Sequence, residues 1–151
     1  MDQQKTILVA TDGSPAASAA VDAAVALAAA LQQAVRFVHA ASPLAEELFA
    51  EYFGDKPPVE RVIESDSVLA AAAECARQQG VEVEVDLIAE AGSADLAAEI
   101  AGLAEGIHAS MIVVGSRGRG SVSGAVLGSV SHGLIKFATI PVLVVHARDG
   151  G

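Results

Sequence analysis

The sequence predicts an open, doubly wound α/β fold, in which helices cover both faces of a sheet of five parallel strands. Short apolar segments typical of strands alternate with longer segments of helical composition along the chain. Residues 6–10 and 111–115 are apolar apart from Thr6, which is typical of central strands that are buried on both faces. The 151 residues have the length of one domain and contain no linker-like segment, so we expect a single domain over residues 1–151.

The first part of the chain is expected to form a strand, a helix and a second strand. A buried strand at 5–12 leads into a helix at 13–33, which its alanine-rich composition favours. Ser14 is suited to cap this helix, and Pro15 to occupy its first position, where no backbone N–H is needed. Residues 34–41 are again mostly apolar and form the second strand.

The middle of the chain is expected to contain an irregular segment and a second helix. Residues 42–64 include two adjacent prolines and are predicted to be irregular, apart from one helical turn around 45–53. The alanine-rich segment 66–80 favours a helix. Gly80 predicts its end, because glycine readily adopts the left-handed conformation found after helices.

Residues 81–89 alternate apolar and acidic side chains, which is the period of a strand with one solvent-facing side. Such a strand belongs at an edge of the sheet. There, Glu82, Glu84 and Asp86 would discourage pairing with another chain.

The last part of the chain is expected to contribute two helices and two strands. Ser93 is suited to cap a helix at 93–109, and the apolar segment 110–116 forms the fourth strand. A short helix at 129–138 and a strand at 141–147 complete the fold. The short helix carries three apolar side chains on one face, namely Val130, Leu134 and Phe137.

Composition and charge exclude several kinds of partner. The formal net charge is −10, so binding to nucleic acid or to an anionic membrane is not expected. The single cysteine, Cys75, together with the lack of a leader-like or membrane-spanning segment, predicts a cytoplasmic protein. Cys75 lies in an alanine-rich helix and is expected to be a small core residue.

Residues 113–133 hold six glycines and five serines directly after an apolar strand. A Walker A loop is excluded, because Leu134 stands where the phosphate-binding lysine would follow Gly133. The fingerprint G-x-G-x-x-G is also excluded, since it would follow the first strand and its spacing differs. The remaining spacing is G-x₂-G-x₉-G-[ST], formed by Gly115, Gly118, Gly128 and Ser129.

With this spacing the chain resembles the nucleotide-binding branch of the universal stress protein family. The segments ILVATDGSPAASAAVDAAVALA, IVVGSRGRG and GSVSHGLIKFATIPVLVV are also similar to that family, so the resemblance covers nearly the whole chain outside 42–64. It implies a Rossmann-like fold, as in adenine nucleotide alpha hydrolases, with strand order 3-2-1-4-5. It also implies a regulatory protein of the stress response that binds ATP or another adenine nucleotide, with Mg²⁺ or Mn²⁺ carried on the phosphates.

The carboxyl edge of the predicted sheet is suited to such a ligand, because ligands of open parallel sheets lie beyond the carboxyl ends of the strands. Asp12 follows the first strand and Gly115 the fourth, so both face one crevice if these strands are neighbours. Gly115 and Gly118 would let the backbone approach a phosphate. Gly128 and Ser129 begin the last helix, where free N–H groups and the helix dipole favour an anion.

Side chains complete the predicted site. The Ser129 and Ser131 hydroxyls would donate further hydrogen bonds, and Asp12 would bind a ribose hydroxyl or a cation carried on the phosphates. The resemblance places the adenine near Ala10, Thr11, Val38 and His39. The remaining predicted positions lie in the glycine-rich stretch, at Ser116, Arg117, Arg119 and Val130. No residue is predicted to be catalytic or to bind a metal directly.

Each of these features has a structural alternative. A glycine–serine stretch is also typical of a flexible loop. Asp12 before Gly13 is also typical of a tight turn. The side chains of Arg117 and Arg119 could simply be solvated at the surface. Slow ATP hydrolysis, for which no general base beyond Asp12 is evident, and a ligand-free interaction module of the same fold both remain open. The histidines lack metal-ligand spacing and are expected to be structural or solvated: His39, His108, His132 and His146.

The last strand predicts a homodimer. Residues 141–147 carry no formal charge, and an apolar edge strand favours pairing with another chain. The expected cover is a second copy that pairs antiparallel about a two-fold axis and buries Val142, Val144 or their neighbours. The resemblance implies the same arrangement, since dimers of this kind are common in the family.

Overall fold

A computed structural model describes residues 4–41, 51, 58–89, 92–117 and 127–147. The strands are β1 Thr6–Ala10, β2 Ala34–Ala41, β3 Val83–Ala89, β4 Met111–Gly115 and β5 Val142–Val145. The helices are α1 Pro15–Leu31, α3 Val59–Ser65, α4 Ser67–Gln78, α5 Ser93–Gly106 and α6 Ser129–Phe137. No helix within these residues is long and apolar enough to cross a membrane.

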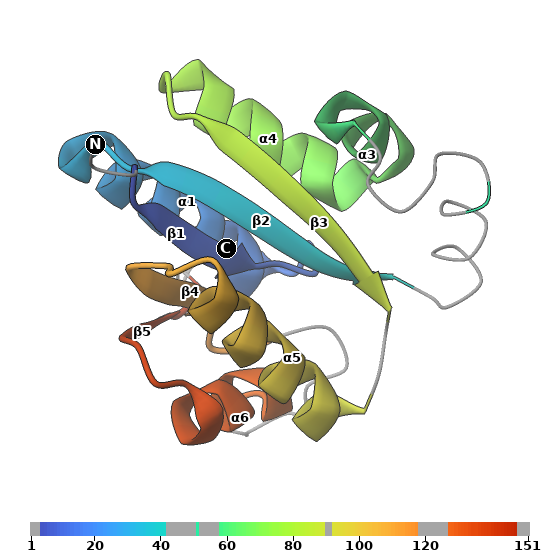
Figure 1. The fold of residues 1–151 in the computed structure, drawn as a ribbon, viewed down its shortest axis with the longest axis vertical. Helices are drawn as coiled ribbons and strands as arrows, with labels where there is room; N and C mark the ends of the chain where they lie inside the picture. The colour runs from blue at the N-terminus through green and yellow to red at the C-terminus, as the bar shows by residue number, and fades with distance from the viewer. Residues whose placement is uncertain (1–3, 42–50, 52–57, 90–91, 118–126, 148–151) are drawn as a thin grey trace.

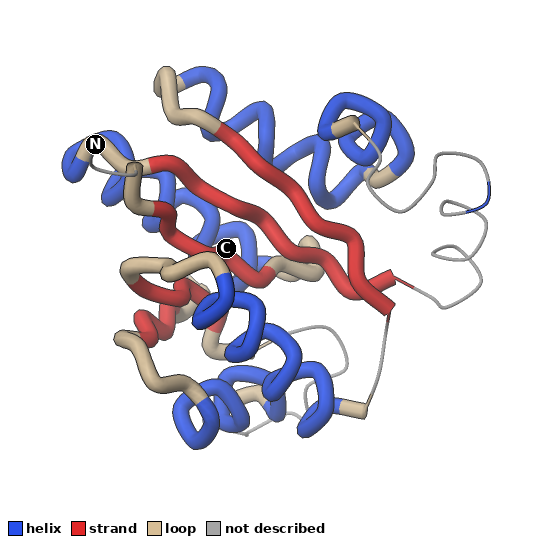
Figure 2. Tube along the Cα trace, viewed as in Figure 1, coloured by secondary structure: helices blue, strands red, loops and turns tan. Residues whose placement is uncertain are grey.

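The five strands are parallel and form one sheet in the order β3-β2-β1-β4-β5, which confirms the predicted fold class and strand order. Helices α5 and α6 cover one face of the sheet, and α1, α3 and α4 cover the other (Figure 1). Figure 2 shows the twisted strands lying between these two helical layers.

Side-chain alternation along the central strand β1 divides the core into two parts. Ile7 and Val9 pack with α1 and α4, whereas Leu8 and Ala10 pack with α5 and α6. All four side chains are buried. Because both faces of β1 are covered, the strand is continuously apolar, as expected for a central position.

The ends of α1 and α4 have the caps that their sequences indicate. Ser14 caps α1 by accepting a hydrogen bond from the N–H three residues on, and Pro15 is the first helical residue. Asp66 caps α4 by accepting a hydrogen bond from the N–H of Leu69 (2.9 Å). Gly80 follows α4 and has φ +71°. This is the left-handed conformation expected of a glycine that ends a helix.

The segment between β2 and α4 contains a helix that the sequence prediction missed. Residues Val59–Ser65 form α3 inside the region expected to be irregular. Its apolar residues Val59, Val62 and Ile63 pack against the core, but seven residues are too few to show helical periodicity clearly. The turn predicted around 45–53 lies outside the described residues, apart from Glu51.

Two predictions about the later helices are wrong in detail. Ser93 is the first residue of α5 rather than its cap, and Gly92 occupies the N-cap position. Phe137 is 42% exposed although Leu134, on the same predicted face, is buried. The chain leaves α6 at this point, and Ala138 packs against the core where Phe137 was expected.

The edge strand β3 is confirmed, but its acidic face is partly neutralised by its neighbour. Arg36 of β2 lies in register with Glu84 and donates hydrogen bonds to Glu84 (3.0 Å) and, through two nitrogens, to Asp86. The hydrogen bond with Asp86 raises the pKa of Arg36, against the opposing effect of burial, and the charges of both acids add to it. Glu84 and Asp86, which were predicted to discourage pairing at this edge, therefore also hold β3 to β2.

Two glycines let neighbouring elements approach more closely than a Cβ would permit. A Cβ on Gly115 would lie 2.7 Å from backbone atoms in the first turn of α1. A Cβ on Gly133 would lie 2.6 Å from the Cβ of Ala97, where α6 packs on α5. Gly102 in α5, by contrast, faces open space.

We expect Gly115→Ala to lower the free energy of unfolding by about 1–3 kcal/mol, because the rigid backbone of α1 occupies the space that the new methyl group needs. Gly102→Ala is the matched control. The same change inside a helix with open space around it is expected to raise stability by about 0.5–1 kcal/mol. Urea denaturation measures both variants, and an unchanged stability of Gly115→Ala would contradict the close approach.

Candidate functional site

The carboxyl end of β1 continues into a tight turn that its own side chains hold. The Asp12 carboxylate accepts a hydrogen bond from the N–H of Ser14 (2.9 Å), and the Thr11 hydroxyl oxygen accepts one from the N–H of Gly13 (3.3 Å). Gly13 has φ +78°, a left-handed conformation that glycine adopts without strain. The turn role predicted as an alternative for Asp12 is confirmed, and a ligand role for the same carboxylate stays a prediction.

The buried hydroxyl of Ser14 links this turn to the start of the glycine-rich stretch. It donates a hydrogen bond to the carbonyl oxygen of Arg117 (3.3 Å), whose side chain is exposed. Close by, the first turn of α1 fills the space that a Cβ on Gly115 would need. The packing of α1 therefore explains why Gly115 has no side chain, and the approach of a phosphate to its backbone stays a prediction.

The two ends of the glycine-rich stretch meet at a loop root, which consists of Ser116, Gly128 and Ser131. The N–H of Gly128 donates to the carbonyl of Ser116, and the N–H of Ser116 donates to the carbonyl of Val145 in β5 (2.7 Å). The Ser131 hydroxyl is buried and lies 3.2 Å and 3.0 Å from the Ser116 and Gly128 carbonyl oxygens, to which it donates. Its single hydrogen is thus used inside the protein, and a further hydrogen bond from Ser131 to a phosphate stays a prediction.

The start of α6 is the feature of this edge best suited to an anion. Gly128 occupies the N-cap position, Ser129 is the first, exposed residue and Val130 is half-buried. The first N–H groups of a helix have no partner within the helix, and the positive end of the helix dipole lies there, so both favour a phosphate group. Gly118 and Arg119 lie outside the described residues, and their roles stay predictions.

The residues predicted to lie near an adenine are on β1 and β2, and their role toward an adenine stays a prediction. Ala10 and Val38 are buried in the core under α5 and α6, and the carbonyl of Val38 already accepts a hydrogen bond from the N–H of Thr11 (2.9 Å). Ala40 lies two residues beyond Val38 on the same face and is only half-buried. The sequence prediction did not include Ala40, although the period of two along this strand indicates it.

His39 faces the opposite side of the sheet. Its Nδ1 lies 2.9 Å from a carboxylate oxygen of Asp66, and the two side chains are 19% and 13% exposed. Since Asp66 also caps α4, this pair ties the end of β2 to the first turn of that helix. The side chain of His39 therefore has a structural role. His108, His132 and His146 are exposed.

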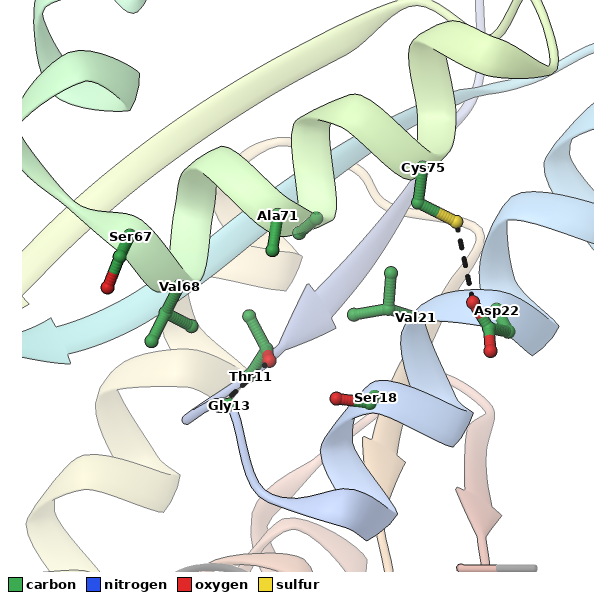
Figure 3. Close-up of a pocket in the computed structure, with 10 residues that line it drawn as sticks. Thr11, Gly13, Ser18, Val21, Asp22, Ser67, Val68, Ala71 and Cys75 are labelled. Atoms are coloured by element: carbon green, nitrogen blue, oxygen red, sulfur yellow. Dashed lines mark hydrogen bonds between the residues drawn. The ribbon is translucent and has the colours of Figure 1, made fainter.

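A groove between α1 and α4 adjoins the β1–α1 turn (Figure 3). Its cavity volume is about 320 Å³, and Thr11 and Gly13 contribute to its lining together with side chains of both helices. Within it the Cys75 thiol donates a hydrogen bond to Asp22 (3.4 Å). Burial, followed by this contact, raises the pKa of Cys75, so the thiol is not an activated nucleophile. Cys75 packs against the core, as its sequence context predicts.

The described side chains offer little metal or nucleophilic chemistry. Within the described ranges no group of three or more His, Cys, Asp or Glu side chains is placed to hold a metal ion. What the carboxyl edge does offer is backbone N–H groups at the start of α6, the carboxylate of Asp12 and the exposed side chain of Arg117. This set is suited to binding a phosphorylated ligand.

Known proteins resemble this chain over most of its length. The model of the universal stress protein family matches residues 4–146. The universal stress protein YxiE of Bacillus subtilis is 35% identical over 147 residues, which cover 92% of this chain and 97% of that protein. The universal stress protein Rv1996 of Mycobacterium tuberculosis is 35% identical over 164 residues, which cover 96% of this chain. The matched residues cover 50% of Rv1996, so this chain spans about half the length of that mycobacterial relative.

Solved structures share the fold. The structure of hypothetical protein MJ0577 has a TM-score of 0.73 at 25% identity, with coverage of 97% of this chain and 98% of that one. A universal stress protein solved in complex with cAMP has a TM-score of 0.67 at 28% identity, with coverage of 97% and 100%. The parallel sheet with its strand order, and the family match over nearly the whole sequence, show that this chain belongs to the universal stress protein family.

Proposed function

We propose that this chain binds an adenine nucleotide at the carboxyl edge of its sheet, and that occupancy of the site changes the surface offered to partner proteins. The observation that carries the proposal is the convergence of three features: the Asp12 turn, the loop root and the start of α6. The hydrogen bond from Ser14 to Arg117 joins the turn to the glycine-rich stretch. Gly128 belongs both to the loop root and to the N-terminus of α6.

The proposed ligand is ATP, with Mg²⁺ or Mn²⁺ carried on its phosphates. The phosphates would lie at the start of α6, where N–H groups and the helix dipole attract negative charge. Asp12 would repel a phosphate, so its place is beside the ribose hydroxyls or the cation. The adenine would lie beyond the end of β2, beside the half-buried Ala40.

Two further observations support an adenine nucleotide. The spacing G-x₂-G-x₉-G-S, which begins at Gly115 and ends at Ser129, is complete. A universal stress protein that is 28% identical to this chain, and similar over 97% of it, was solved in complex with cAMP. Both observations favour a nucleotide-binding module over a ligand-free interaction module of the same fold.

We expect ATP with Mg²⁺ to bind with micromolar affinity and to stabilise the fold. At a ligand concentration of about 100 times Kd, linkage adds about 2.7 kcal/mol of stability. For a domain of this size, the melting temperature should then rise by roughly 5–10 °C. Differential scanning fluorimetry with millimolar Mg–ATP measures the shift, with Mg²⁺ alone as the control. A transition that ATP, ADP, AMP and cAMP all leave unmoved would refute the proposed function.

Asp12→Asn separates the two roles of this carboxylate. The asparagine oxygen still accepts the hydrogen bond from Ser14 and keeps the turn, so stability should stay close to that of the wild type. Loss of the charged acceptor should weaken ATP binding by about 1–3 kcal/mol, the scale of a charge-assisted hydrogen bond. Calorimetric titration measures the affinity. An unchanged Kd would leave Asp12 with its turn role alone.

ATP turnover is expected to be slow or absent. The Walker A lysine is missing, since Leu134 follows Gly133, and the carboxylate of Asp12, the candidate base, is already engaged by the turn. The rate of phosphate release should stay well below about 1 s⁻¹, the lower range of dedicated phosphoryl-transfer enzymes. A faster rate that follows the protein through purification would establish the alternative, an ATPase.

A second copy of this chain is the proposed partner along the segment 141–147. In the described residues β5 pairs only with β4, and its side chain Leu143 is 38% exposed. Ile135 and Phe137 of α6 are exposed as well, at 54% and 42%. An apolar edge strand of this kind is suited to antiparallel pairing about a two-fold axis.

Leu143→Asp is expected to convert the protein to a monomer without unfolding it, because this side chain is exposed in the single copy. Light scattering should give twice the chain mass of 15.2 kDa for the wild type and a single chain mass for the variant. Ala71→Asp is the control and should stay dimeric, because Ala71 is an exposed residue of α4, which covers the other half of the sheet. A monomeric wild type at micromolar concentration would exclude the dimer.

A further inference from the structure

Ser14 makes two hydrogen bonds that serve different elements. Its hydroxyl oxygen accepts from the N–H of Ala17, which caps α1, and its hydroxyl hydrogen donates to the carbonyl of Arg117, 103 positions away in sequence. Both distances are 3.3 Å. The residue is 6% exposed, so the hydroxyl has no room to serve a ligand directly.

The position of Ser14 connects the two halves of the proposed site. Its backbone N–H is held by Asp12, and its hydroxyl holds Arg117, through which the chain enters the glycine-rich stretch. This hydrogen bond restricts the direction in which the carbonyl of Arg117 can point. At the other end of the stretch, a separate hydrogen bond from the N–H of Gly128 to the carbonyl of Ser116 holds the chain.

We propose that Ser14 is a positioning residue for the nucleotide site, which holds Arg117, where the chain leaves β4, in place relative to the Asp12 turn. The inference rests on the proposed function, since it concerns the binding of that same nucleotide. It assigns to Ser14 a role that helix capping does not require, because a cap needs only an acceptor, whereas the contact with Arg117 needs a donor.

The two roles of Ser14 are separable by substitution. Threonine keeps the hydroxyl, and therefore both hydrogen bonds. Glycine lacks the hydroxyl but is almost as good an N-cap residue as serine, whereas alanine is a poor one. If Ser14 acts only as a cap, the proteins with serine, threonine or glycine at this position should have similar melting temperatures, and the alanine variant the lowest. If Ser14 has the proposed positioning role, the affinity for the nucleotide should be similar with serine and threonine, and lower with both glycine and alanine.

The experiment measures the Kd for Mg–ATP by calorimetry and the melting temperature of the free protein for the wild type, Ser14→Thr, Ser14→Gly and Ser14→Ala. We expect Ser14→Gly to melt only slightly below the wild type and above Ser14→Ala, but to bind Mg–ATP about five- to tenfold more weakly. Arg117 is then no longer held in place in the free protein, so binding must order it, at a cost on the scale of one neutral hydrogen bond. Ser14→Ala should lose similar affinity and melt lower. Ser14→Thr should restore both properties.

Ser110→Ala is the matched control. The Ser110 hydroxyl also makes a side-chain contact, with Gln33 (2.6 Å), but it lies just before β4, at the amino edge of the sheet. Its loss should leave the Kd unchanged. A Ser14→Gly variant that binds like the wild type, with affinity lost only in Ser14→Ala, would overturn the positioning role and leave Ser14 as a cap. If Ser14→Thr does not fold, the comparison of glycine with alanine still decides. A wild-type protein that binds no adenine nucleotide would refute the proposed function itself, and this inference with it.

Discussion

The close approach of the first turn of α1 to the end of β4 determines where everything at the carboxyl edge lies. Gly115 permits this approach because a Cβ there would lie 2.7 Å from the helix backbone. With α1 at this distance, the buried hydroxyl of Ser14 reaches the carbonyl of Arg117. The pairing of β1 with β4 already makes the ends of these strands neighbours in space, and this contact joins residues 103 positions apart in sequence.

Within the described residues, the polar groups at the carboxyl edge include buried and outward-facing ones. The side chains of Ser14 and Ser131 are buried and use their hydroxyl hydrogens within the protein. The start of α6, with the exposed Ser129, and the side chain of Arg117 face outward. A phosphate at this edge would thus be held mainly by backbone N–H groups, which is consistent with a chain that has only nine lysine and arginine residues in total.

The two edges of the sheet differ in chemistry, and one of them is joined to the candidate site. At β3, Arg36 pairs with Glu84 and Asp86, so charged groups cover the edge and bind it to β2. At β5, the exposed residue is Leu143. The carbonyl of Val145, at the end of β5, accepts a hydrogen bond from the N–H of Ser116 in the loop root. The strand proposed to pair with a second copy is therefore in direct contact with the base of the proposed nucleotide loop.

The order of the elements could be predicted from the sequence because burial determines which side chains each strand carries. Continuous apolar runs mark the covered strands β1 and β4, and alternation with acids marks the edge strand β3. Local backbone requirements were equally legible, as in the cap at Ser14 and the helix end at Gly80. The short helix α3 was missed because seven residues carry too little periodicity.

Only part of the candidate site could be predicted from the sequence. The glycine spacing indicates a loop and a helix start, and both Asp12 and Gly128 lie at the predicted edge. Only the tertiary structure decides that Gly115 faces α1, that Ser131 supports the loop root and that His39 pairs with Asp66. The physical reason is that a sequence pattern reports local conformation and which face is buried. The partner of a buried hydrogen-bonding group depends instead on which distant segments the packed sheet brings within about 3 Å of one another.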